Sequence, residues 1–138
     1  MENLDILAAQ TAQKIIEDTM KFKAKEVENL ATKALGVLQE NGVYAATLFL
    51  YSRTGTEAKI APFIRKQLLE MAAQKVVNRQ TPQDRSQDAL RFVIEHIAND
   101  LDTLLLVKQI WEQTLIYVRY GAKAQSAEKD KSSKEQAT

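Results

Sequence analysis

The chain contains no cysteine, so disulfide bonds and thiolate metal sites are excluded. It has a single histidine, His96, and neither the adjacent Glu95 nor Asp100 completes a set of metal ligands. Its four glycines are too few to build a phosphate-binding loop, and no serine or threonine stands beside a histidine that could activate it. The sequence therefore predicts no catalytic site, no metal and no cofactor, and we expect a protein that is not an enzyme.

Long hydrophobic runs are also absent. The longest uncharged apolar stretch, residues 43–51, is too short to span a bilayer. Acidic residues between Glu2 and Asp18 interrupt the N-terminal segment, which therefore lacks the continuous apolar region of a signal peptide. We expect a cytoplasmic protein without a membrane partner.

Charge of one sign is not in large excess over the whole chain. Nineteen basic and eighteen acidic residues among 138 give a net charge of +1, which is no signature of nucleic-acid binding. The distribution is uneven, because residues 53–91 carry eight basic and only four acidic side chains. This segment is either a solvated helix surface, which is the commoner case, or a surface that binds a polyanion. The run Lys21-Phe22-Lys23-Ala24-Lys25 could likewise contact phosphate or simply end a helix in solvent.

Apolar residues recur at helical spacing through most of the chain. Asn3 or Asp5 can cap a first helix, which has its apolar positions within residues 4–20. A second helix, over about residues 26–39, places its apolar residues on one stripe. Gly42 can end this helix in a left-handed conformation and turn the chain into the next one.

The stretch at the centre of the prediction is residues 43–51, which carry no charge. A helix that is apolar all round belongs at the centre of a bundle. Thr47, Phe49 and the two tyrosines would also suit a strand, and periodicity cannot decide for so short a run. No other segment reads as a partner strand, so we predict a buried central helix around which the rest of the chain is organised.

Two local signals predict where the following helices begin. Pro62 is disfavoured in a helix interior, so the next helix is expected to begin near Ala61 and to end near Asn78. The segment Thr81-Pro82-Gln83-Asp84 supplies a hydroxyl cap, a proline at the first helical position and a carboxylate three residues after the cap. It predicts the start of a helix that ends at Asn99-Asp100, a pair that can also cap the last helix.

The last predicted helix is the longest and has its apolar positions within residues 104–122. Trp111 is expected to pack in the core and Tyr117 at its margin. Residues 126–138 lack apolar positions to bury, which predicts a disordered C-terminal tail. Residues 1–125 are therefore predicted to form a single all-α domain, a bundle of about five or six helices around the buried central helix.

Several residues of the central region carry a resemblance to a known family. They are Lys33, Val37-Leu38, Asn41-Gly42-Val43, the apolar run through Phe49-Leu50, and Arg53. Their order resembles the central motif of the small helical subunit of the type III-B (Cmr) CRISPR RNA-guided interference complex. Residues 114–122 are similar to the last helix of that family, in which an aromatic residue precedes a basic residue and alanine. The sequence departs from the family pattern at Leu35 (commonly proline), Val43 (leucine), Arg53 (lysine) and Tyr117 (tryptophan).

The resemblance implies a noncatalytic small subunit of a type III CRISPR effector, which stacks in copies beside the other effector subunits during antiviral defence. Such a subunit would contact the backbone of the guide RNA and the target RNA, while base pairing supplies sequence recognition. Lys33 and Arg53 are the RNA-binding residues that match the family motif. Five further RNA-binding residues are assigned from charge alone: Lys59, Arg65, Lys66, Arg79 and Arg85.

A second hypothesis from a different class stays open. The chain could be a helical adaptor or oligomerisation module that binds only protein and has no RNA role. Associated RNA of guide length would distinguish the two hypotheses, because the adaptor has no use for it.

Overall fold

The computed structural model describes the backbone of residues 3–137 and the side chains of residues 3–132. Its helices are α1 (Leu4–Asp18), α2 (Ala24–Tyr51), α3 (Gly55–Met71), α4 (Ser86–Phe92) and α5 (Leu101–Ala137). Two π-helical turns extend them: η1 (Ala72–Val76) follows α3, and η2 (Val93–Ile97) follows α4. No strand occurs between residues 3 and 137, so the predicted all-α bundle is confirmed.

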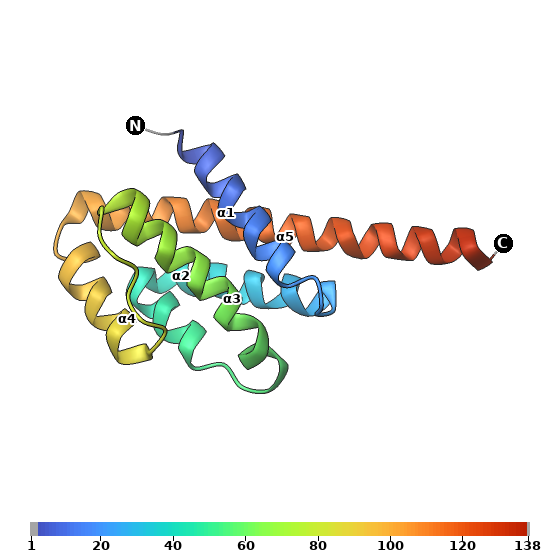
Figure 1. Ribbon diagram of the computed structural model, residues 1–138, viewed down its shortest axis with the longest axis horizontal. Helices are drawn as coiled ribbons and strands as arrows, with labels where there is room; N and C mark the ends of the chain where they lie inside the picture. The colour runs from blue at the N-terminus through green and yellow to red at the C-terminus, as the bar shows by residue number, and fades with distance from the viewer. Residues whose placement is uncertain (1–2, 138) are drawn as a thin grey trace.

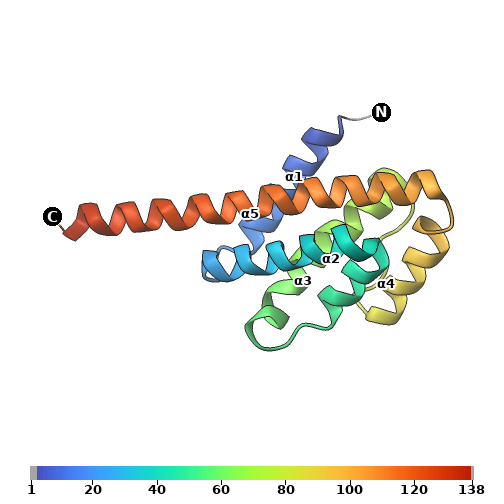
Figure 2. The ribbon, with the colours of Figure 1, turned by 180° about the vertical axis from the view of Figure 1, so that it is seen from behind.

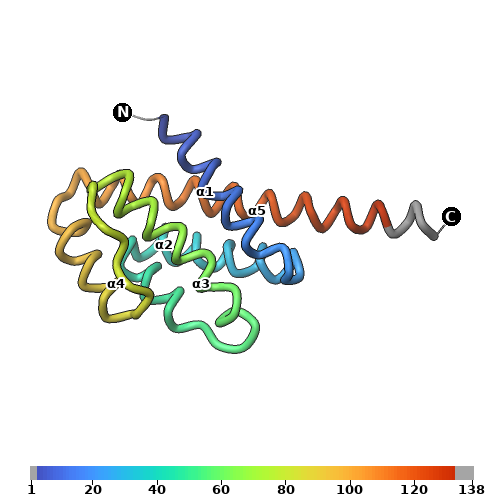
Figure 3. The backbone as a smooth tube through the Cα atoms, viewed as in Figure 1, coloured from blue at the N-terminus to red at the C-terminus, as the bar shows by residue number. Residues whose placement is uncertain are grey.

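Helices α1 and α2 both pack along α5, and these are the most extensive helix–helix contacts of the bundle. Helices α1 and α3 lie on the side shown in Figure 1, whereas α2 and α5 face the viewer in Figure 2. The C-terminal part of α5 projects beyond the other helices, as the backbone path in Figure 3 also shows. In the part of the chain described here, no helix combines the length and the apolar character needed to cross a membrane.

Trp111 of α5 lies in the centre of the core and is only 1 % exposed. Its Nε1 donates a hydrogen bond to the carbonyl oxygen of Leu68 on α3, at 3.0 Å. This bond satisfies the indole donor away from water and fixes α5 against α3. Tyr117 is half-buried, and its hydroxyl donates to the Asp5 carboxylate on α1. The predicted core and margin positions of these two aromatic residues are confirmed.

The break predicted at Gly42 is present inside α2. Gly42 has φ +93° and ψ −173°, a region of backbone conformation that is almost restricted to glycine. The apolar stripe before the break is buried as predicted, and its members are Val27, Leu30, Ala31, Ala34, Leu35 and Leu38. Gly42 therefore separates α2 into two helical segments with a kink between them.

The helix over residues 43–51 is not buried on every side. Its buried residues are Val43, Ala46, Thr47 and Leu50. On the opposite side, Tyr44 is 42 % exposed and Leu48 is 46 % exposed, while Phe49 is half-buried. The prediction of a fully buried central helix is therefore wrong, because this half of α2 lies in the outer layer of the bundle and packs through one face only.

Helix α3 begins at Gly55 and not near Ala61, so Pro62 lies in the helix interior and the predicted start is wrong. Tertiary contacts hold the additional turns, because Ile60 is fully buried and Glu57 pairs with cations of α2 and of the turn after it. These contacts outweigh the penalty of about 3 kcal/mol that proline imposes inside a helix.

The segment 81–84 does not begin a helix, which corrects the second boundary prediction. Turn η1 carries α3 to Val76, and Asn78, with φ +54°, ends it at the predicted position. An irregular loop follows, and α4 begins only at Ser86. The predicted cap fails because the Asp84 carboxylate accepts hydrogen bonds from side chains of α2 and α3 instead.

The N-terminal ends of α1 and α5 are capped as predicted. Asn3 Oδ1 accepts a hydrogen bond from the first turn of α1 (2.9 Å), and Asp100 accepts one from the backbone N–H of Thr103 (3.0 Å). Helix α5 is the longest helix and continues to Ala137, through most of the segment for which the sequence predicts disorder. Residues 127–132 are all exposed, so no packing holds this part of the helix, and disorder of the tail stays a prediction.

Candidate nucleic-acid interface

The structure divides the seven predicted RNA-binding residues into two groups. Four have acidic partners within the chain: Lys33, Arg53, Arg65 and Arg85. The other three are exposed, and none of the described acidic side chains pairs with them: Lys59, Lys66 and Arg79. The two groups therefore differ in what they can offer to an external polyanion.

Lys33 and Arg53, the two basic residues of the motif that carries the family resemblance, meet at one carboxylate. Lys33 Nζ lies 2.9 Å from Glu57 Oε2, and the Arg53 guanidinium lies 3.4 Å from Glu57 Oε1. The hydrogen bond from Lys33 is the main cause that lowers the pKa of the Glu57 carboxyl, and Arg53 adds to it. The carboxylate therefore stays ionised at neutral pH and joins the first turn of α3 to the first half of α2 and to the turn that follows α2.

Arg53 also caps the C-terminal end of α2. Its Nε donates to the carbonyl oxygen of Phe49 at 3.0 Å, and its guanidinium carbon lies 3.7 Å from the centre of the Phe49 ring. The same carbonyl also accepts from the Ser52 backbone N–H at 3.1 Å, and the cation opposes the negative end of the helix dipole. The geometry gives Arg53 a structural role.

Arg65 joins three segments of the chain. Two nitrogens of its guanidinium donate to the two oxygens of Asp84, at 2.8 and 3.1 Å, and a third donates to the carbonyl oxygen of Leu50 at 3.2 Å. The same guanidinium lies over the Tyr51 ring, at 4.2 Å from its centre. This arrangement uses the planar fork of arginine fully and leaves little of it for a ligand.

Tyr51 completes the cluster by donating its hydroxyl to Asp84 Oδ1 at 2.8 Å. Hydrogen bonding from Arg65 is the main cause that lowers the pKa of Asp84, and the Tyr51 hydroxyl lowers it further. Partial burial, together with the neighbouring Asp84 carboxylate, raises the pKa of Tyr51. We call Arg53, Arg65, Glu57 and Asp84 the arginine corner.

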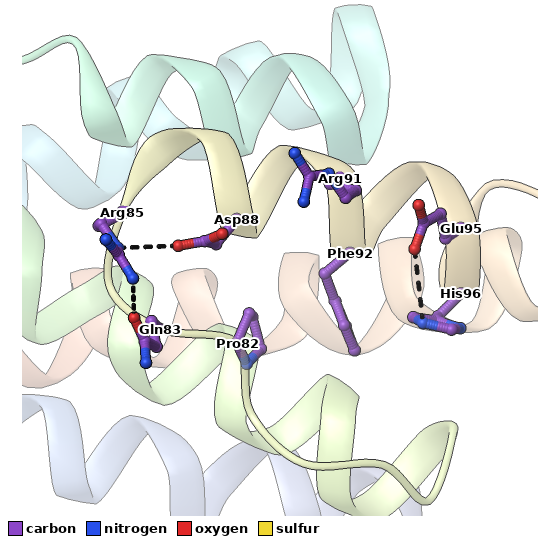
Figure 4. Close-up of a pocket in the computed structure, with 8 residues that line it drawn as sticks. All are labelled: Pro82, Gln83, Arg85, Asp88, Arg91, Phe92, Glu95 and His96. Carbon is purple, nitrogen blue, oxygen red and sulfur yellow. Dashed lines mark hydrogen bonds and ion pairs between the residues drawn. The ribbon is translucent and has the colours of Figure 1, made fainter.

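Arg85 lies at the rim of a hollow of about 380 Å³, which α4, η2 and the preceding loop form (Figure 4). Its guanidinium pairs with Asp88 at 2.9 Å and donates to the side chain of Gln83. On the other side of the hollow, the His96 ring lies 5.2 Å from the Phe92 ring and 3.9 Å from a Glu95 oxygen. Cations and carboxylates alternate here, so the hollow has no net preference for an anion, and no metal-binding group of acidic or histidine side chains occurs among the described residues.

Lys59 and Lys66 share the exposed side of α3. They are seven residues apart, so two helical turns bring them to nearly the same side of the helix. Arg79 is also exposed, but it lies beyond η1, where its backbone N–H donates to the carbonyl oxygen of Ala73. Arg79 is therefore separated from Lys66 by the last turns of α3 and by η1.

Lys21, in the turn between α1 and α2, contacts α3 at Phe63, on the side of the helix that carries Lys59 and Lys66. Its ammonium lies 4.5 Å from the centre of the Phe63 ring and 5.4 Å from that of Phe22, and the two rings are 5.9 Å apart. Phe63 stands between Lys59 and Lys66 on α3. The alternation of lysine and apolar residues after Met20 was the sequence signal for Lys21. We call Lys21, Lys59 and Lys66, with the rings of Phe22 and Phe63, the lysine face.

Comparison with known proteins gives no relative from which a role for either group of cations could be transferred. The sequence matches no protein-family model, and it matches no curated protein. The role of these cations is therefore argued from the geometry and charges of the chain, together with the resemblance of its central motif.

Proposed function

We propose that the chain is the noncatalytic small subunit of a type III CRISPR effector, and that it contacts the backbone of the guide and target RNA. The strongest support is that residues spread along the family-like motif come together in the folded chain. Its glycine breaks α2 at Gly42, and its two basic residues, Lys33 and Arg53, then converge on the Glu57 carboxylate. Residues that are far apart in the motif therefore act together in one corner of the fold.

In this function, the protein supplies charge and shape, and base pairing supplies sequence recognition. Exposed cations such as Lys59 and Lys66 would gain affinity mainly by releasing counterions from RNA phosphates. The paired cations Lys33, Arg53 and Arg65 would instead stabilise the fold that positions Lys59 and Lys66. This division explains how a chain of net charge +1 can still offer a local basic surface.

A second candidate function, the protein-binding adaptor, is favoured by an exposed apolar surface. Tyr44 and Leu105 (53 % exposed) line a hollow of about 350 Å³ between α2 and α5, and Leu48 and Leu101 are exposed one turn away on the same helices. Exposed apolar side chains gathered in this way mark protein contacts. An effector subunit also needs such contacts, so only the presence of RNA separates the two candidates.

The test is reconstitution with the other subunits of a type III effector, with and without guide RNA. We expect the chain to co-elute with those subunits and with RNA of guide length at low salt. The variant Leu105→Asp should reduce assembly while leaving the monomer folded, since Leu105 is exposed. A chain that binds partner proteins but never carries RNA would be an adaptor, and a chain that joins no effector subunit would refute the proposal.

A further inference from the structure

We propose that the lysine face, formed by Lys21, Lys59 and Lys66 around the Phe22 and Phe63 rings, is the surface that binds the phosphate backbone of RNA. This inference deepens the proposed function and rests on it for the choice of RNA. It also adds Lys21 to the RNA-binding residues and removes the arginine corner from them.

The geometry of α3 places the lysines together. Lys59, Phe63 and Lys66 follow one another at intervals of four and three residues, which is the spacing of neighbours on one helix side. The opposite side of α3 is turned into the core, where Ile60 and Ile64 are fully buried. The rise of about 1.5 Å per residue separates Lys59 from Lys66 by about 10 Å along the axis. The two ammonium groups can therefore reach different phosphates of one strand.

Lys21 is held in position by the two aromatic rings. A cation over the face of an aromatic ring is attracted by the negative potential of the ring. Because its ammonium lies over both Phe63 and Phe22, Lys21 is oriented before any ligand arrives. A lysine without such support loses more conformational freedom when it binds a phosphate.

Among the described residues no acidic side chain forms an ion pair with Lys21, Lys59 or Lys66, although Glu70 lies one helical turn beyond Lys66 on the same side of α3. Asp18 accepts a hydrogen bond from Gln67 Nε2 at 3.3 Å, and Glu57 is held by Lys33 and Arg53. Because none of the three lysines is held in an internal ion pair, each ammonium can pair with an external anion. Both rings are half-buried and covered by Lys21, so the face fits a phosphate backbone better than the interior of a lipid layer, which needs protruding apolar groups.

The experiment measures binding of fluorescein-labelled single-stranded RNA of mixed sequence to the full chain by anisotropy, at several salt concentrations. The triple variant Lys21→Ala/Lys59→Ala/Lys66→Ala should lose affinity by about tenfold or more at low salt, and its log-log salt slope should fall by about 2. The matched control removes three exposed lysines of α5 with the same change in charge: Lys123→Ala/Lys129→Ala/Lys131→Ala. The control should retain most of the parental affinity.

Equal losses in the triple variant and in the control would overturn the inference, because they would show a general charge effect. Parental affinity in the triple variant, no RNA binding by the parent, or preferential binding of phosphatidylserine vesicles would overturn it as well. If the triple variant unfolds at a lower temperature than the parent, the double variant Lys59→Ala/Lys66→Ala tests the same point. This variant keeps Lys21 and its contacts with the two rings. Effector reconstitution is scored separately: RNA binding through the lysine face without assembly would refute the effector function alone, and assembly with unchanged RNA binding would refute the face alone.

Discussion

The arginine corner and two lysines of the lysine face, Lys59 and Lys66, come from the same basic segment, but their side chains make different contacts. Arg65 bonds a carboxylate with two nitrogens, a helix carbonyl with a third, and stacks on a ring. Lys66, the next residue, is exposed and unpaired among the described side chains, because successive residues point about 100° apart around a helix. The comparison teaches that a count of basic residues overestimates the cations available to a ligand. The planar fork of arginine suits internal ties, whereas lysine remains a hydrated point charge.

Damage to the core that the arginine corner and the lysine face share should destabilise both of them. Trp111→Ala removes a fully buried ring and its hydrogen bond to the Leu68 carbonyl oxygen. We expect the free energy of unfolding to fall by about 3 to 5 kcal/mol, measured by denaturant titration. Trp111→Phe should lose less, because it keeps most of the volume. A loss near zero for Trp111→Ala would mean that α5 does not pack as described.

Loss of the Arg65 fork should damage the corner and spare the lysine face. Arg65→Ala removes the two bonds to Asp84 and the bond to the Leu50 carbonyl, so we expect a loss of about 1.5 to 3 kcal/mol. Arg65→Lys keeps the charge but not the fork and should recover only part of that stability. Thermal melts measure both variants, and full recovery by lysine would show that the fork geometry does not matter.

Substitution of alanine for each of two glycines of α2 should change the free energy of unfolding in opposite directions. Gly42→Ala forces a Cβ into a conformation reserved for glycine and should destabilise the fold by about 1 to 3 kcal/mol. Gly36 has no positive φ, and a Cβ added there meets no atom within 4 Å, so Gly36→Ala should stabilise by about 0.5 to 1 kcal/mol. Changes of the same sign in denaturant titrations would contradict the kink that brings Lys33 and Arg53 together.

The decrease of stability at acid pH should come from the two carboxylates of the arginine corner. The pKa values of Asp84 and Glu57 are lowered in the folded chain, so their stabilisation is complete above the unfolded pKa of about 4 and is lost as the pH falls through the folded values. Because the Asp84 side chain is 52 % exposed, we expect it to contribute less than about 1 kcal/mol to this dependence. Melts from pH 7 to pH 2.5 should show a shallower decline in Asp84→Asn, and a decline parallel to that of the parent would contradict the pairing.

The sequence predicted most features of the fold that depend on local signals, but the cap signal at residues 81–84 failed because Tyr51 and Arg65 hold the Asp84 carboxylate. Apolar periodicity predicted the helices, and Gly42 predicted the break, because a left-handed position before an apolar run requires glycine regardless of tertiary structure. The exposed side of residues 43–51 could not be predicted, since it depends on which helices happen to cover α2. The start of α3 before Pro62 was missed for the same reason.

The candidate site was predicted only in part. Charge identified Lys59 and Lys66, but it could not separate them from Arg65, whose partner Asp84 is 19 residues away in the sequence. The ion pair between Lys33 and Glu57 spans 24 residues and is equally invisible to local patterns. Lys21 belongs to the face only because α1 and α3 pack side by side and bring Phe22 to Phe63.

The central claim is that RNA affinity resides in the lysine face and that the arginine corner holds the fold. Its most direct test compares two variants with the same change in charge, Lys59→Gln/Lys66→Gln and Arg53→Gln/Arg65→Gln, in RNA-binding titrations at several salt concentrations and in thermal melts. The lysine variant should keep its melting temperature and lose about 1.4 units of salt slope, at about 0.7 per phosphate contact. The arginine variant should melt several degrees lower yet keep the parental affinity and slope at a temperature where it is folded. An arginine variant that loses as much slope as the lysine variant, or more, would contradict the claim.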